Sequence, residues 1–396
     1  MLMSLVFGTV CNLSRIARLR IMRARGCGLV LSLGLLLLPP PAHSMDQGPA
    51  RWDQLVKAAE EEGELVLYGP SAMGRRNPGE IERAFEKRFQ GIRVRPTLGS
   101  GRAILPRLLS ERRANRYIPD VLIGGTTDTL LTLKPAGAVA PLRPQFVLPE
   151  VVDESAWLFG RLPWGDANEP YTTLMFQGYV QTMAYVNTQL VDPGQFKSYW
   201  DLLNPKWKGK IVSSDIRRGG RGGVVSRFAF KSPELGPEFL RRLFSEMDIT
   251  LSTDPRQMVD WLAKGRYHIA LFLSSGDVGS AQEKGLPVAH VQADQFSEGA
   301  PIAPGGGAIS ILDRPPHPNA AVLFINWLLS REGQIKWQEA QRLPSLRVDI
   351  SKEGLHAYDV PNPGFKYVMG GAEEYSRVTR SSIVKVITQA MSKTGR

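Results

Sequence analysis

Short apolar strands alternate with amphipathic helices in the first part of this 396-residue chain. Hydrophobic residues recur with helical spacing in three segments, form compact runs in two others and alternate with polar residues in a third. The predicted helices cover 51–62, 78–90 and 104–115, and the predicted strands cover 65–68, 92–98 and 120–125. Because parallel strands need a crossover, usually a helix, this order favours a mostly parallel sheet with helices on both faces. The pattern therefore predicts an α/β fold.

A second α/β series follows a stretch rich in Pro and Trp near residues 140–180. Its predicted strands cover 210–215, 250–253, 269–273 and 288–291, and its predicted helices cover 222–230, 237–247 and 255–264. A further apolar segment over 308–312 leads into a long amphipathic helix over 318–329. Since the chain is longer than one core usually serves, we expect two lobes. Lobe I takes residues 45–175, lobe II takes 176–300, and residues 301–396 return to lobe I and end in C-terminal helices.

The N-terminus has the layout of an export signal, predicted to occupy residues 1–44. A basic start at Met22 precedes the apolar run over 29–38, and small residues end the segment at Ser44. A helix of that length is too short to cross about 30 Å of hydrocarbon. We therefore expect cleavage near Ser44 and a soluble periplasmic protein. Whether translation starts at Met1 or Met22 stays open.

The formal charge of +11 is unevenly spread, because residues 1–44 hold five arginines and no acid. The rest of the chain has only a mild basic excess and no long Lys/Arg run, so we expect no nucleic-acid partner. The two cysteines, Cys11 and Cys27, both precede the predicted folded part. That part is therefore expected to contain neither disulfides nor a cysteine metal site.

Common catalytic and metal-binding motifs are missing from the sequence. It contains neither a G-x-S-x-G nucleophile motif nor a phosphate-binding P-loop. The five histidines show no metal-ligand spacing; they are His43, His268, His290, His317 and His356. We therefore expect no enzyme activity, no cofactor and no metal site.

Three longer sequence blocks stand in the order found in one known group of proteins. Residues 199–211 read YWDLLNPKWKGKI, residues 316–334 read PHPNAAVLFINWLLSREGQ, and residues 343–349 read LPSLRVD. Through these blocks the chain resembles the bacterial extracellular solute-binding proteins, the periplasmic substrate-binding components of ABC transporters, and within them the group related to ferric-iron binders. The resemblance covers roughly residues 51–350. It implies a type II periplasmic binding protein fold, with two α/β lobes, a hinge of two crossovers and an interlobe ligand cleft.

The resemblance also implies a function and partners. We expect a receptor, monomeric, that closes its lobes on a small molecule or ion and presents it to an ABC permease in the inner membrane. The ligand expected first is a small polar, anionic solute, and ferric iron, alone or with an anion, comes second. A periplasmic enzyme or a signalling receptor on the same fold remain alternatives.

Candidate ligand residues follow the predicted strands, because ligands of open α/β sheets bind beyond the carboxyl ends of the strands. Hydroxyl groups, backbone N–H groups at helix starts and forked guanidinium groups suit an oxyanion. The predicted ligand residues are Ser71, Ser100, Gly101, Arg102, Thr126, Arg217, Arg218, Ser274, Ser275 and Asp277. We expect Arg102 to form an anion clamp with the basic loop over 217–221. A solvated basic loop is the alternative for these arginines.

The resemblance also places the iron-ligand positions of the ferric binders in this chain. They correspond to Ala72, Thr126 and Ser275-Gly276. Hard Fe(III) prefers anionic oxygen donors, and none of these residues supplies one. We therefore expect no direct iron binding there. Asp277 is the one nearby carboxylate, and it suits an ammonium group or a sugar hydroxyl.

Overall fold

The computed structural model describes residues 48–74, 78–218 and 222–392. The predicted export signal lies outside these described residues. Within them, none of the helices has the length and apolar character needed to cross a membrane.

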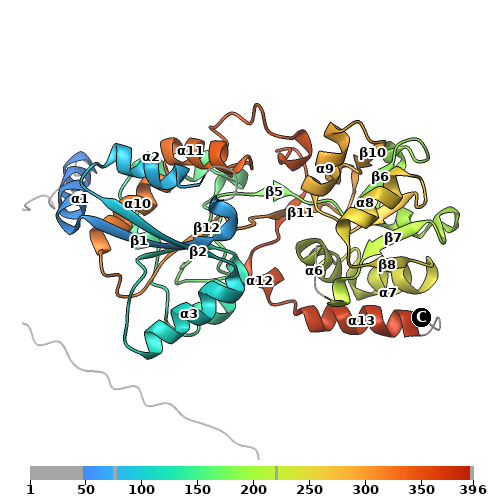
Figure 1. Ribbon diagram of the computed structural model, residues 1–396, viewed down its shortest axis with the longest axis horizontal. Coiled ribbons are helices and arrows are strands. Elements are labelled where there is room, and N and C mark those ends of the chain that lie inside the picture. The colour runs from blue at the N-terminus through green and yellow to red at the C-terminus, as the bar shows by residue number, and fades with distance from the viewer. Residues whose placement is uncertain (1–47, 75–77, 219–221, 393–396) are drawn as a thin grey trace, which may run out of the picture. The chain divides into compact units, whose positions relative to one another are not determined.

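Lobe I is built on a five-stranded sheet in the order β2-β1-β3-β12-β4 (Figure 1). Its strands are β1 (Glu64–Pro70), β2 (Arg93–Gly99), β3 (Val121–Gly124), β4 (Leu174–Met175) and β12 (Ala308–Ile311). The first three run parallel, as predicted. β12 runs antiparallel to both β3 and β4. Its position follows the second crossover, which brings the chain back from lobe II.

Helices cover both faces of the lobe I sheet because successive strand residues point to opposite sides. Leu65 and Leu67 belong to the larger core, on the face of α1, α2, α10 and α11, whereas Tyr68 packs with Ile104 and Leu108 of α3. The helices are α1 (Gly48–Glu62), α2 (Glu80–Arg88), α3 (Gly101–Arg113), α10 (Pro318–Leu329) and α11 (Arg331–Gln341). At their carboxyl ends, β1 is followed by a short helical turn over 71–74, and β2 is followed almost at once by α3.

Lobe II contains a second five-stranded sheet in the order β10-β6-β9-β7-β8. Its strands are β6 (Ala184–Asn187), β7 (Ile211–Ser214), β8 (Thr250–Ser252), β9 (Ile269–Leu271) and β10 (Val288–His290). The helices are α6 (Gly223–Lys231), α7 (Gly236–Glu246), α8 (Pro255–Ala263), α9 (Ser275–Glu283) and α13 (Arg380–Ser392). Residues of α6, α7 and α13 share one core, and residues of α8 and α9 share another. The C-terminal helix α13 therefore belongs to lobe II.

A small third sheet joins the lobes at the hinge. β5 (Tyr179–Val180) and β11 (Ala300–Ala303) are the two crossovers, and they pair antiparallel. A third strand, β13 (Tyr367–Met369), pairs parallel with β11 and was not predicted. After β13 the chain forms the short helix α12 (Glu373–Ser376) and then α13. The two α/β lobes and the two crossovers that the resemblance implied are both present, and the lobe limits within the chain stay a prediction.

Candidate ligand-binding site

The start of α3 lies at the carboxyl end of β2, where the sequence predicted ligand residues. Ser100 precedes the helix, and its carbonyl oxygen accepts hydrogen bonds from the N–H groups of Ala103 and Ile104 at 2.9 Å. The Ser100 side chain makes no capping hydrogen bond to a described residue. The hydroxyl and the first N–H groups of α3 are therefore available for a ligand. Arg102 and Ser71 are both exposed at this edge.

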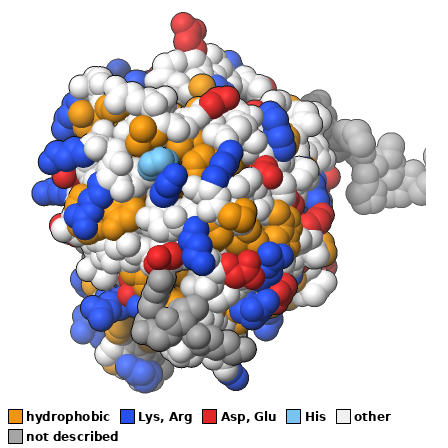
Figure 2. Space-filling model, turned by 90° about the vertical axis from the view of Figure 1, so that its right-hand side faces the viewer, with side chains coloured by type: hydrophobic (Ala, Val, Ile, Leu, Met, Phe, Trp, Pro, Cys, Tyr) orange, Lys and Arg blue, Asp and Glu red, His pale blue; other side chains and the backbone are white. Residues whose placement is uncertain are grey.

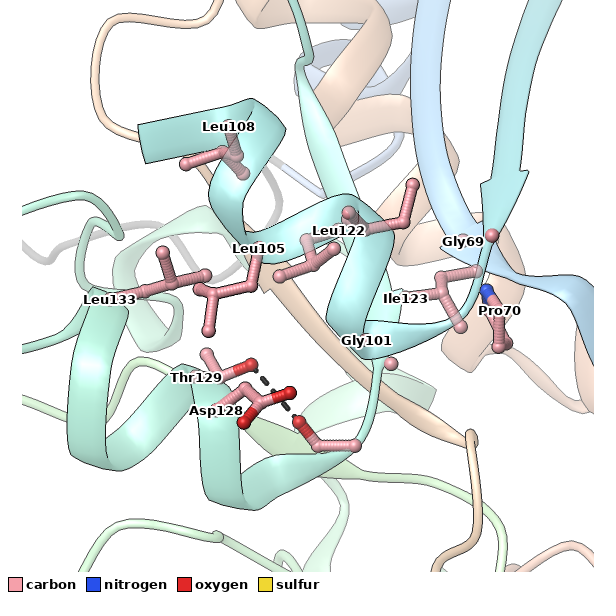
Figure 3. Close-up of a pocket in the computed structure, with 14 residues that line it drawn as sticks. Gly69, Pro70, Gly101, Leu105, Leu108, Leu122, Ile123, Asp128, Thr129 and Leu133 are labelled. Carbon is pink, nitrogen blue, oxygen red and sulfur yellow. Dashed lines mark hydrogen bonds between the residues drawn. The ribbon is translucent and has the colours of Figure 1, made fainter. Parts of the chain in front are cut away.

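A small cavity of about 70 Å³ lies beside this helix start, at the ends of β1, β2 and β3 (Figure 3). Its walls are mostly glycine backbone and leucine side chains, and Asp128 is its charged residue. The carboxylate of Asp128 lies against Gly101, where a Cβ atom would come within 2.7 Å of Oδ2. Thr126 is buried at 3% exposure, so its side chain is not available at the surface. The cavity is therefore small and mostly apolar, with Asp128 as its charged wall.

A second cavity, of about 230 Å³, brings together arginines from both lobes. Arg102 of α3 lines it from lobe I, and Arg227 of α6 and Arg380 of α13 line it from lobe II. The other lining residues are small or aliphatic apart from Ser226, and no acidic residue is among the described ones that line it. The cavity is therefore strongly electropositive.

Arg380 and Arg227 are held differently in this cavity. Arg380 donates from Nε to the carbonyl oxygen of Ile216 at 3.3 Å and from Nη2 to that of Arg217 at 2.6 Å. The Nε atom of Arg227 is buried and has no hydrogen-bond partner in the described part of the chain. Burial lowers the pKa of Arg227. A partly buried guanidinium with an unpartnered, buried Nε is costly, and a bound anion would offset that cost.

Arg217 and Arg218 do not line the arginine cavity as the structure describes it. Arg217 donates two hydrogen bonds to Asp215, from Nε to Oδ1 at 2.9 Å and from Nη2 to Oδ2 at 3.0 Å. Burial raises the pKa of Asp215, but the hydrogen bonds and charge of Arg217 outweigh it, and the net shift is downward. Nε of Arg218 lies 3.6 Å from Oδ2 of the same carboxylate, and the Arg218 side chain is 75% exposed. The remaining loop residues, 219–221, lie outside the described residues, so the predicted clamp stays a prediction.

The other predicted lobe II residues gather at the start of α9. The Ser274 hydroxyl caps the helix by accepting from the N–H of Asp277 at 3.3 Å. Ser275 is buried, and its carbonyl oxygen lies 3.2 Å from Nε2 of His290. The ring of Tyr358 stacks on that histidine, with centroids 3.8 Å apart. Ser274 and Ser275 therefore already have structural roles at this helix start.

The iron-type positions carry no donor cluster in this structure. Ala72 lies in an exposed turn after β1, and Ser275-Gly276 form the first turn of α9. Across residues 48–74, 78–218 and 222–392, no three His, Cys, Asp or Glu side chains come close enough together to hold a metal ion.

Three residues that line these cavities were not predicted from the sequence: Arg227, Arg380 and Asp128. Arg227 lies within a predicted helix whose neighbours are mostly apolar, which was the one available signal. Arg380 follows a region with no predicted element. Its place in the same cavity as Arg102 depends on the packing of α13 on lobe II, which local sequence does not reveal.

The surface of lobe II carries both signs of charge. Figure 2 shows this side, where Lys and Arg side chains are interspersed with acidic and apolar ones. On that face of the described residues there is no continuous basic stripe of the kind that binds nucleic acid.

Comparison with known proteins supports the fold and the family. AfuA from Actinobacillus pleuropneumoniae, solved with fructose-6-phosphate bound, superposes with a TM-score of 0.53 at 18% identity, covering 83% of this chain and 97% of that one. For iron-bound HitA from Pseudomonas aeruginosa the TM-score is 0.55 at 19% identity, with 83% and 99% covered. A Trichodesmium protein (IdiA, FutA) in complex with iron and citrate gives 0.61 at 16% identity, with 83% and 99% covered. At these identities the likeness establishes the type II periplasmic binding protein fold.

Two sequence matches extend this result. A probable ABC transporter periplasmic-binding protein, y4fP, of Sinorhizobium fredii is 24% identical over 272 residues, which cover 66% of this chain and 68% of the relative. Residues 67–340, well over half of the chain, match the family described as bacterial extracellular solute-binding protein. The chain therefore belongs to the bacterial extracellular solute-binding protein family.

Proposed function

We propose that this protein is the periplasmic solute-binding component of an ABC import system and that its ligand is a small anion held between the lobes. The observation that carries this proposal is the arginine cavity, where Arg102 of lobe I and Arg227 and Arg380 of lobe II line one space with no described acidic residue. The positive charges of these arginines repel one another, and a bound anion would offset that repulsion.

The position of the three arginines links anion binding to lobe closure. A ligand that contacts Arg102 and Arg227 at the same time stabilises the arrangement in which the lobes approach each other. Guanidinium groups offer planar, forked donors that match carboxylate and phosphoryl oxygens. The permease of the import system, in the inner membrane, is the partner that recognises this closed form.

The same observations guide the choice among the alternatives. Ferric iron without a bound anion is disfavoured because the iron-type positions supply no anionic oxygen. An iron–anion complex could still use the arginine cavity through its anion, and one structural relative was solved with iron and citrate. A receptor role agrees with the family. We propose that the receptor acts as a monomer and without catalysis.

A thermal-shift screen of the purified protein tests the proposal. Inorganic phosphate, phosphonates, sugar phosphates, small carboxylates and ferric citrate are compared with neutral sugars and amines at equal ionic strength. A ligand that binds only the folded state raises the melting temperature by mass action. At least one anion should raise it, with the shift lost in Arg102→Ala. Stabilisation by a neutral or cationic solute alone would overturn the anion assignment.

A further inference from the structure

A large open pocket lies beside the hinge, apart from the arginine cavity. It encloses about 800 Å³ between residues 143–171 of lobe I and the C-terminal segment of β13 and α12. Among described residues, the two cavities share none of their lining. The proposed anion site therefore does not account for this pocket.

A column of aromatic rings leads from the core of lobe I to the wall of this pocket. The rings of Phe146 and Trp164 are stacked with an interplanar angle of 8°, and those of Trp164 and Tyr171 with an angle of 11°. Phe146 is buried, whereas Tyr171 is partly exposed and lines the pocket. The near-parallel column therefore ends on a ring that a planar ligand can continue, in the offset geometry that aromatic pairs favour.

Phe159 adds a second aromatic surface in an unusual backbone conformation. Its φ angle is 68°, which is rare for a bulky residue, and its side chain is 41% exposed. The neighbouring residue, Leu158, is fixed by a hydrogen bond from its N–H to the carbonyl oxygen of Leu346 at 2.9 Å. An apolar ring therefore lies exposed at the pocket, where its contact with water costs free energy.

The charges around the pocket identify the polar end of the ligand. Its acidic residues are engaged: Asp166 with Lys134 at 2.5 Å, Glu154 with Arg143 at 3.7 Å, Glu373 with Arg377, and Glu374 with Lys231 at 2.7 Å. Arg161 also lines the pocket, is exposed, and has no ion-pair or hydrogen-bond partner among the described residues. The Arg161 guanidinium is therefore available to pair with an anionic group of a ligand.

We propose that this hinge pocket is a second binding site, for a planar aromatic ring that carries a carboxylate. The ring stacks on Tyr171 beside Phe159, and the carboxylate pairs with Arg161. Because β13 pairs with the crossover strand β11, the occupied pocket contacts the hinge itself. This proposal does not depend on the identity of the anion in the arginine cavity.

Isothermal titration with 2-naphthoate as the probe tests the site, with 2-naphthamide and cyclohexanecarboxylate as controls for charge and for planarity. We expect one saturable site for 2-naphthoate and weaker binding of both controls. Arg161→Ala should weaken 2-naphthoate binding about two- to tenfold, the range of a partly exposed charge pair, and leave 2-naphthamide binding unchanged. Tyr171→Leu should weaken both naphthyl probes by a similar factor.

Two further variants separate this site from other sources of binding. Arg102→Ala, in the arginine cavity, and Arg256→Ala, exposed on lobe II, should leave 2-naphthoate affinity unchanged. Since Arg161 is exposed, its variant is expected to fold, and a melting curve checks this. Undetectable binding of 2-naphthoate, or equal affinity in wild type, Arg161→Ala and Tyr171→Leu, would refute the hinge site. Loss of affinity in Arg102→Ala would refute it as well, since the probe would then occupy the arginine cavity.

Discussion

Replacing Arg227 with methionine should change binding and stability in opposite directions. The substitution removes the partly buried guanidinium, whose buried Nε has no described partner, and keeps a long apolar side chain at this position of α6. If Arg227 serves the ligand, the unliganded variant should be as stable as the wild type or more stable, since a partly buried charge with an unpartnered Nε is lost. If Arg227 only supports the fold, the substitution should destabilise the unliganded protein and leave anion affinity unchanged.

The expected loss in affinity follows from the geometry of the cavity. A hydrogen bond to a charged group contributes about 1.5–3 kcal/mol, which corresponds to roughly a 10- to 100-fold loss of anion affinity. Because Nε of Arg227 is buried and the rest of the guanidinium is partly buried, salt should screen this effect less than it screens an exposed charge pair. Calorimetry with the anion found in the screen, at low and high salt, gives the affinity, and urea unfolding without ligand gives the stability.

Arg256→Met is the matched control, because Arg256 is an exposed arginine of lobe II whose side chain makes no hydrogen bond or ion pair with another described residue. It should change neither quantity. The reasoning fails if Arg227→Met destabilises the unliganded protein while anion affinity is unchanged.

Four further outcomes are expected. N-terminal sequencing of exported protein should begin at or near Met45, and a full-length product retained in the membrane would contradict this. Ferric citrate should produce no tyrosinate-to-iron absorption band, because the iron-type positions lack tyrosine; a visible band at micromolar concentration would reverse the ligand ranking. Arg102→Ala should weaken anion binding about 10- to 100-fold with little change in the unliganded melting temperature, whereas Arg218→Ala should not weaken it. Burial raises the pKa of Asp359 to about 7, so the folded state holds this proton where the unfolded state has lost it. The free energy of unfolding should therefore fall as pH rises from about 4 through about 7, and Asp359→Asn should flatten that slope in urea titrations.

Much of the fold could be predicted because hydrophobic spacing reports which residues are buried. The helix predicted over 318–329 coincides with α10 (Pro318–Leu329), since a proline starts it and a nearly continuous apolar face follows. The apolar segment over 308–312 contains β12 (Ala308–Ile311), but spacing could not show that this strand runs antiparallel to β3. β13 was missed because its three residues are only partly buried and form no distinct pattern.

The candidate site was less predictable, because it depends on which surfaces meet. Arg102 was selected for its place after a strand, and it does line the arginine cavity. Arg217 was selected by the same rule, yet its guanidinium is engaged by Asp215 two residues earlier. Arg380 lies at the cavity because α13 packs against α7. Local sequence does not show this contact, because the two segments are far apart in the chain.

The late arrival of β12 has a consequence for how the chain folds. The lobe II strands, β6 to β10, all lie within residues 184–290, whereas β3 ends at Gly124 and its partner β12 begins at Ala308. Closing a long loop costs entropy and slows the pairing of distant strands. Lobe II should therefore acquire its sheet first on refolding, while one edge of β3 waits unpaired. An unpaired strand edge is a template for other chains, so the refolding yield should fall as protein concentration rises.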